Sequence, residues 1–193
     1  MMGPSVTYAQ FEWETGVTPF SSPAAPVTGV LLYLFVVFGM RTALGGKALG
    51  VHRSLVALHN LVLFAASGIM FVGCAYEAVL EVNRVGSTEW LFCLPIGTPV
   101  KGPIFFWSYV YYLSKFYELL DTVILVLKGK PLTFLHVFHH SAVMAMAYLW
   151  LESAQSLQVL GLLFNTGVHV IMYYYYFLCS LGLPPPWKKI ITN

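Results

Sequence analysis

Five long apolar stretches dominate this sequence and restrict what it can fold into. They cover residues 24–41, 55–79, 104–127, 132–151 and 157–181. About 20 apolar residues in a helix cross the hydrocarbon core of a bilayer. Because lipid-exposed backbone has no water to bond, each stretch must be helical. The sequence therefore predicts an all-α, multi-pass transmembrane helix bundle of about five spans, forming one membrane domain over residues 1–193.

The composition excludes an ordinary soluble domain. The 193 residues are 58% hydrophobic and 9% charged, with a mean hydropathy of +0.73. Soluble domains carry about 25% charged residues, so this chain has too few polar residues to cover a globule. The net charge is +2, and the basic residues are scattered between apolar stretches. The expected partner is therefore the lipid bilayer, and no nucleic-acid interface is expected.

The basic residues between the spans predict an orientation. With five spans, seven of them fall on one side of the bilayer: Arg41, Lys47, Arg53, Lys128, Lys130, Lys188 and Lys189. Only Arg84 and Lys101 fall on the other side. Loops rich in Lys and Arg stay in the cytosol. We therefore expect the first set to be cytosolic and the N-terminus to lie on the opposite side.

A histidine cluster opens the fourth predicted span. His136, His139 and His140 are spaced i, i+3 and i+4, which places all three imidazoles on one helix face. Their flanks are almost wholly apolar. Ionisable groups in such a setting are costly, so a functional role is favoured over a satisfied polar patch.

Two other spans carry polar groups at a similar depth. The third span contains Lys115, Glu118, Asp121 and Thr122 at i, i+3, i+6 and i+7. The fifth contains Asn165 and His169 on one face, followed by Met172, Tyr173 and Tyr176. By helical rise, all of these lie in the cytosolic half of their spans. The sequence predicts that three helices contribute to one buried polar site reached from the cytosol.

Two kinds of chemistry fit these groups. Four imidazoles could hold one zinc ion. Separately, the His136-x-x-His139-His140 pattern leaves a metal-dependent membrane oxygenase or desaturase as an alternative. However, His139 and His140 are adjacent and point about 100° apart on a helix. A neutral imidazole is also a good acyl acceptor, and a second histidine can act as base. The Lys115 group could hold an anionic substrate group, or it could be an ion pair that only positions helices.

Three segments, in order, resemble the signature boxes of the ELO family of fatty acid elongases. They are Lys115-x-x-Glu118-x-x-Asp121-Thr122, His136-x-x-His139-His140 and Asn165-x-x-x-His169-Val170-x-Met172-Tyr173-x-Tyr175-Tyr176. Leu58-His59-Asn60 and the segment 101–107 also look like family segments, nearest to plant members. The resemblance covers residues 50–193 and implies a 3-oxoacyl-CoA synthase. Such an enzyme condenses a long-chain acyl-CoA with malonyl-CoA, releasing carbon dioxide and CoA.

The resemblance also implies residue roles. His139 would take the acyl group as an acyl-imidazole, with His169 as its partner across the tunnel. His136 and His140 would orient it and act as base. Substrate binding would fall to a polar set from the first and third boxes: Lys115, Glu118, Asp121, Thr122, Asn165, Tyr173 and Tyr176. The family needs no metal and no cofactor beyond its substrates, acyl-CoA and malonyl-CoA.

The resemblance further implies a cellular setting. We expect the endoplasmic reticulum membrane, an active site reached from the cytosol, and compatibility with a homodimer. The expected protein partners are the 3-oxoacyl-CoA reductase, 3-hydroxyacyl-CoA dehydratase and enoyl-CoA reductase of the elongation cycle. Family members have seven spans, six of them around a substrate tunnel, so five spans predict a chain incomplete at its C-terminus. A non-catalytic membrane scaffold is the alternative that follows from this difference.

Overall fold

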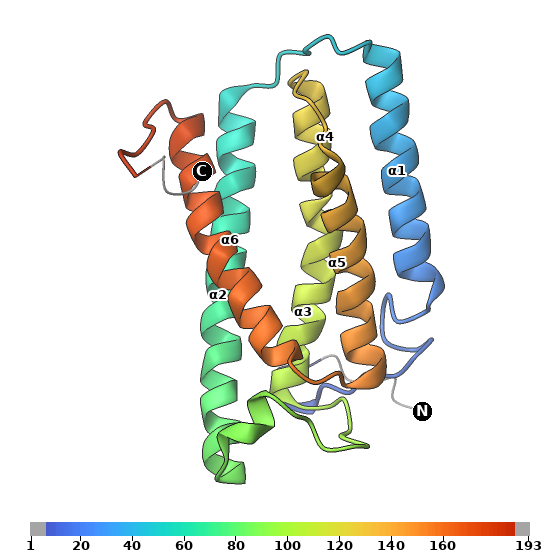
Figure 1. Cartoon of the computed structure of the whole chain (residues 1–193), viewed down its shortest axis with the longest axis vertical. Coiled ribbons are helices and arrows are strands. Elements are labelled where there is room, and N and C mark those ends of the chain that lie inside the picture. The colour runs from blue at the N-terminus through green and yellow to red at the C-terminus, as the bar shows by residue number, and fades with distance from the viewer. Residues whose placement is uncertain (1–6, 188–193) are drawn as a thin grey trace.

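Long helices running roughly side by side make up the structure, a computed structural model that describes residues 7–187 (Figure 1). The α-helices are α1 (Ala24–Leu44), α2 (Arg53–Val85), α3 (Pro103–Glu118), α4 (Leu120–Leu127), α5 (Phe134–Ser153) and α6 (Gln158–Ser180). Two short 3-10 helices, η1 (Tyr8–Gln10) and η2 (Thr88–Leu91), lie in the connecting segments. Within the described residues there is no strand, only an isolated bridge between Glu12 and Lys101. The predicted all-α bundle is confirmed.

Three of the described helices, α1, α2 and α5, are long and apolar enough to cross a membrane. The other predicted spans coincide with α3 followed by α4, and with α6. Apolar side chains also cover outward-facing surfaces, as on α1, where Phe35 is 77% exposed. In water such surfaces would be costly, but in lipid they are the expected lining. The chain is a membrane-spanning helix bundle.

The second span is longer than predicted. Expected to end at residue 79, with a polar loop from Glu81, it continues as helix α2 to Val85. Glu81 and Arg84 lie one turn apart and pair at 2.5 Å, which supports the extra turn. The helix ends where Gly86 takes a left-handed conformation, with φ of 75°. The predicted start of the loop at Glu81 was therefore wrong, because the polar residues that follow residue 79 continue the helix.

The third span is two helices rather than one. Leu119 separates α3 from α4, and the amide of Thr122 donates to the carbonyl of Leu119 at 3.2 Å. This three-residue contact is the tighter turn of a 3-10 helix, a frequent feature of functional regions. Leu119 thus lies between Glu118 and Asp121. Glu118 pairs with Lys115, whereas Asp121 bonds His59 and Tyr173.

The helices pack around α3. Helix α2 packs along α6 and against α3, α3 packs against α5, and α1 packs against α4 and α5 (Figure 1). Helices α2 and α3 meet closely at Gly73, where an added Cβ would lie 2.1 Å from a ring carbon of Trp107. A buried aromatic layer continues this contact, with Tyr111 stacked on Trp150 of α5 at 5.7 Å between ring centroids.

The N-terminal segment closes one end of the bundle. Phe11 is buried, and Trp13 Nε1 donates to Glu152 at 3.2 Å. The Thr15 hydroxyl donates to the same carboxylate at 2.9 Å. These contacts lie at the end of α5, the lower end of the bundle in Figure 1. The histidine cluster lies toward the opposite end.

Candidate active site

The first turn of α5 positions the histidine cluster. Thr133 precedes the helix, and its hydroxyl accepts the amide of His136 at 3.2 Å. This is an N-cap interaction, which satisfies one of the unpaired amides at a helix start. The cap sets the beginning of the helix and so the face that carries His136, His139 and His140. The rings of His136 and His140 lie 4.5 Å apart between centroids.

A cavity of about 400 Å³ lies between α2, α4, α5 and α6 beside this cluster. Its lining is mostly apolar, but it also contains imidazoles, a carboxylate and tyrosine hydroxyls. These include His59, Asp121, His136, His139, His140 and His169. Tyr173 and Tyr176 also line it. Histidines from separate predicted spans therefore share one cavity.

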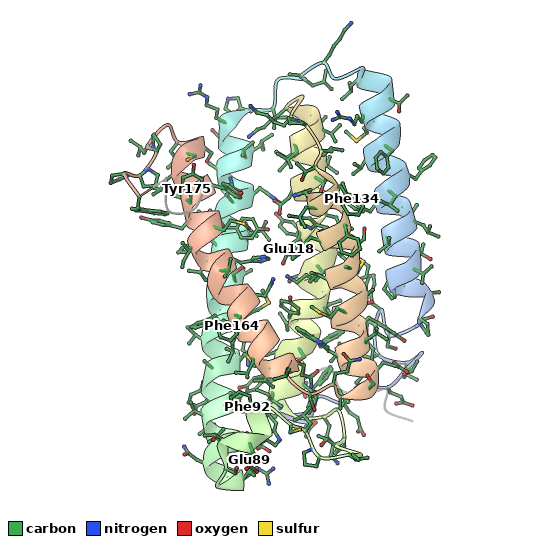
Figure 2. The ribbon with its side chains drawn as sticks, in the orientation of Figure 1. Glu89, Phe92, Glu118, Phe134, Phe164 and Tyr175 are labelled. Atoms are coloured by element: carbon green, nitrogen blue, oxygen red, sulfur yellow. The ribbon has the colours of Figure 1, made fainter. Side chains whose placement is uncertain are left out.

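Lys115 and Glu118 form a buried ion pair beneath this cavity. Lys115 Nζ donates to the two carboxylate oxygens of Glu118 at 2.7 and 2.9 Å and to Asn165 Oδ1 at 3.1 Å. The two side chains are only 3% and 4% exposed. Figure 2 shows Glu118 in the interior of the bundle. The ammonium also lies 4.0 Å from the centre of the Tyr111 ring.

This ion pair links α3 to α6 but does not reach the cavity wall. Lys115, Glu118 and Asn165 are absent from the cavity lining, and so is Thr122. The donors of Lys115 are taken by Glu118 and Asn165. Buried charges need such compensation, because an unpaired charge in a medium of low dielectric constant is very costly. Substrate contact by these four residues stays a prediction.

Asp121 connects three helices at the cavity wall. Its Oδ1 lies 2.7 Å from Nε2 of His59 on α2, and its Oδ2 accepts the Tyr173 hydroxyl of α6 at 2.6 Å. The other ring nitrogen of His59 lies 3.2 Å from the Tyr117 hydroxyl. Sequence analysis assigned no role to His59. The available signal was a histidine followed by an asparagine near the start of an otherwise apolar span.

Thr122 joins the histidine cluster to α1. Its Oγ1 lies 2.8 Å from Nε2 of His136 and 3.0 Å from the hydroxyl of Tyr33. Tyr33 and Thr122 are buried, and His136 is half-buried. One nitrogen of His136 is thereby engaged, which sets the orientation of its ring.

His139 and His140 differ from His59 and His136, whose ring nitrogens are hydrogen-bonded. Within residues 7–187, no hydrogen bond engages a ring nitrogen of either one. His169 is intermediate, because its Nδ1 lies 3.7 Å from Glu118 Oε1, too far for a hydrogen bond. Because His139 is exposed and His136 and His140 are half-buried, His139 has the most accessible imidazole of the cluster.

Across the described part of the chain, no three His, Cys, Asp or Glu side chains converge as a metal ion would require. Asp121, the carboxylate that lines the cavity, bonds His59 and Tyr173.

Comparison with known proteins identifies the family to which this chain belongs. Residues 18–193 match the ELO family, described as the GNS1/SUR4 family. The chain belongs to the ELO family. The resemblance seen in the sequence is therefore confirmed over nearly the whole chain.

Relatives within the ELO family come from distant eukaryotes. Fatty acid elongase sre1 of Dictyostelium discoideum is 40% identical over 189 residues, covering 96% of this chain and 69% of that protein. A second relative from the same organism is 40% identical over 182 residues, covering 94% of this chain and 61% of that protein. Fatty acid elongase 3-like of Arabidopsis thaliana is 31% identical over 192 residues, covering 90% and 65%. The chain thus spans 61–69% of the length of these relatives.

Proposed function

We propose that this chain carries the acyl-transfer centre of a fatty acid elongase, a very-long-chain 3-oxoacyl-CoA synthase. It would condense a long-chain acyl-CoA with malonyl-CoA to give a 3-oxoacyl-CoA two carbons longer, carbon dioxide and CoA. The observation that carries the proposal is the cavity wall with His139 and His140 unbonded, next to imidazoles that are held in place. Membership of the ELO family and its named elongases support the same reaction.

In the first step, a ring nitrogen of His139 attacks the thioester carbonyl carbon. The carbon–nitrogen bond forms, the carbon–sulfur bond breaks, and CoA leaves as a thiolate. The remaining ring proton of His139 passes to His140, leaving a neutral acyl-imidazole. Imidazole suits this role because it is nucleophilic when neutral and its acyl derivative stays activated.

In the second step, malonyl-CoA loses carbon dioxide. The electron pair of the broken carbon–carbon bond becomes a thioester enolate, which attacks the acyl carbon. The acyl–nitrogen bond then breaks, and His140 returns its proton to His139. This sequence consumes no metal, oxidant or cofactor, because decarboxylation supplies the carbanion.

The bonded groups would hold this centre together. Thr122 orients His136, and Asp121 holds His59 and Tyr173. Lys115 neutralises Glu118 close to His169. In this proposal, the residues expected to bind substrate, Tyr176 among them, contact the malonyl group once the substrate has entered.

The cellular setting belongs to the same proposal. The cavity would open to the cytosolic side of the endoplasmic reticulum membrane, where CoA thioesters are dissolved. The product would pass to the reductase, dehydratase and enoyl reductase that complete an elongation cycle. Homodimerisation is compatible with this arrangement.

The test is to trap the acyl-enzyme. The full chain in microsomes is given a labelled long-chain acyl-CoA without malonyl-CoA, and peptides are mapped by mass spectrometry. The acyl mass is expected on the peptide containing His139, and hydroxylamine should remove it. The label should disappear in His139→Ala and persist in His52→Ala, a matched histidine outside the cavity lining. Malonyl-dependent product formation by His139→Ala would contradict the proposed role.

A further inference from the structure

A second hollow, of about 420 Å³, lies at the end of the bundle opposite the histidine cavity. The end of α2, the η2 segment and the start of α3 form it, at the lower end of Figure 1. It shares no lining residue with the histidine cavity. Its volume is within the range of small-molecule sites, and no step of the proposed reaction uses it.

Charged side chains of both signs line this hollow: Glu77, Glu81, Arg84 and Lys101. Glu81 and Arg84 neutralise each other, because the guanidinium donates to both oxygens of the Glu81 carboxylate. Glu77 and Lys101 form no ion pair with each other or with any other residue that the structure describes. The hollow therefore contains one carboxylate and one ammonium that are not neutralised.

The N-terminal segment positions both of these charged residues. The Tyr8 hydroxyl donates to Oε1 of Glu77, and Oε2 has no partner among residues 7–187. Lys101 is held through its backbone, which forms the isolated antiparallel bridge with Glu12. Within the same range, no hydrogen bond engages the Lys101 ammonium. An acceptor and a donor therefore remain free at separate places in one hollow.

The hollow lies at the level of the lipid headgroups. Helix α2 has 33 residues, and at 1.5 Å per residue its length of about 50 Å exceeds the ~30 Å hydrocarbon core, so its last turns lie outside that core. The loop beside the hollow carries exposed apolar side chains, with Phe92 56% exposed (Figure 2) and Ile96 fully exposed. Trp90 lines the hollow, and tryptophan is enriched at the membrane–water interface. The hollow is therefore reached from the headgroup layer.

We propose that this hollow binds the headgroup of phosphatidylethanolamine, an ethanolamine phosphodiester that carries one phosphate and one primary ammonium. Lys101 binds the phosphate as a point charge, and the free oxygen of Glu77 accepts a hydrogen bond from the ethanolamine ammonium. A choline headgroup has no N–H to donate, and a glycerol headgroup brings no cation to Glu77. A bound headgroup links the end of α2 to the segment that precedes α3.

The test measures lipid binding to the full chain by native mass spectrometry. The delipidated protein in a neutral detergent is titrated with phosphatidylethanolamine, phosphatidylcholine or phosphatidylglycerol of identical acyl chains. One phosphatidylethanolamine should bind about ten-fold more tightly than phosphatidylglycerol, because a charge-assisted hydrogen bond to Glu77 replaces a repulsion. Equal affinity for these two lipids would overturn the proposal. So would phosphatidylcholine that binds as tightly as phosphatidylethanolamine, because choline cannot donate the hydrogen bond.

Glu77→Gln removes the carboxylate charge and should abolish the preference between lipids. The affinity for phosphatidylethanolamine should fall to that for phosphatidylglycerol, which should itself be kept or rise because the repulsion is gone. A misfolded chain would lose both lipids, so retained phosphatidylglycerol separates loss of the site from loss of the fold. Glu89→Gln is the matched control, an exposed carboxylate at the same end but outside the lining, and should change the affinity less than about two-fold. An undiminished preference in Glu77→Gln would contradict the site.

Lys101→Gln should weaken both lipids about ten-fold, since each carries the phosphate that Lys101 binds. Lys101→Arg keeps the charge and should retain the wild-type affinities, which shows that the position tolerates substitution. Lys130→Gln is the matched control, because it removes the same charge outside this lining. An equal loss in Lys130→Gln would assign the effect to the net charge of the chain and overturn the site.

Glycerophosphoethanolamine separates a membrane lipid from a dissolved phosphodiester, because it has the same headgroup but no acyl chains. Displacing bound phosphatidylethanolamine should take at least about ten-fold molar excess of this probe, since it lacks the apolar contacts of the acyl chains. Displacement at equal concentration would overturn the lipid in favour of a soluble ligand. The site goes beyond the proposed function, and its test reads lipid binding without turnover, so either proposal can fail alone.

Discussion

His59 Nε2 lies 2.7 Å from Asp121 Oδ1, and this contact joins α2 to α4 at the wall of the histidine cavity. The second oxygen of Asp121 accepts the hydroxyl of Tyr173 from α6 at 2.6 Å. One carboxylate therefore aligns three helices. Because each helix also contributes to the cavity lining, the cavity's shape depends on this carboxylate.

Loss of the His59 imidazole should weaken this alignment. We expect His59→Ala to lower elongation activity at least about ten-fold, since a hydrogen bond to a charged group contributes about 1.5–3 kcal/mol. Incorporation of labelled malonyl-CoA by microsomes measures the effect. His52→Ala is the matched control, because His52 caps the start of α2 outside the cavity. Equal activity in both variants would contradict a role for the His59–Asp121 contact.

We expect the Thr122 hydroxyl to affect turnover by orienting the ring of His136. Thr122→Val keeps the shape of the side chain but removes its contacts with His136 and Tyr33. Turnover should fall about five- to ten-fold, consistent with a hydrogen bond of about 1 kcal/mol or slightly more. Tyr33→Phe removes only the Tyr33 contact and should have a smaller effect. If the two variants lose turnover equally, orientation of His136 by Thr122 is not the cause.

The buried pair of Lys115 and Glu118 should show strong coupling. Lys115→Met leaves Glu118 buried without its cation and should lower the free energy of unfolding by about 3–5 kcal/mol. Adding Glu118→Gln should recover a large part of that loss, because the uncompensated charge is gone. Unfolding in detergent across the double-mutant cycle measures the coupling. Simple additivity of the two losses would rule out a stabilising pair.

Close packing at Gly73 should be sensitive to a single methyl group. Gly73→Ala places a carbon against Trp107 and should destabilise the protein by about 1–3 kcal/mol through overpacking. Gly39→Ala is the matched helical control, since nothing lies within 4 Å of its added carbon. Thermal midpoints in detergent compare the two. A lower midpoint for Gly39→Ala than for Gly73→Ala would contradict this packing.

Parts of the site followed from sequence spacing alone. The i, i+3, i+4 spacing of His136, His139 and His140 predicted one face, and the structure brings all three to one cavity. Equal depth in separate spans predicted contact between the third and fifth spans, which the Lys115–Asn165 and Asp121–Tyr173 bonds confirm. These predictions succeeded because helical geometry and the bilayer together restrict where polar groups can lie.

Other parts could not follow from spacing. The predicted shared face of residues 115–122 does not separate Asp121, on the cavity wall, from Glu118 beneath it. The tight turn at Leu119 and the choice of neighbours make that separation. His59 was likewise unassigned, because its partner Asp121 lies 62 positions away in the sequence.

The linear pattern of this chain was sufficient to establish a membrane helix bundle, its polar boxes and its family. Apolar stretches of this length form helices in a bilayer, because lipid offers no other partner for the backbone hydrogen-bonding groups. Packing of α2 and α4–α6 settled which imidazoles are bonded: His59 and His136 have partners, whereas His139, His140 and His169 have no hydrogen bond within the described residues. Those outcomes depend on distances between residues remote in the chain, which no local periodicity encodes.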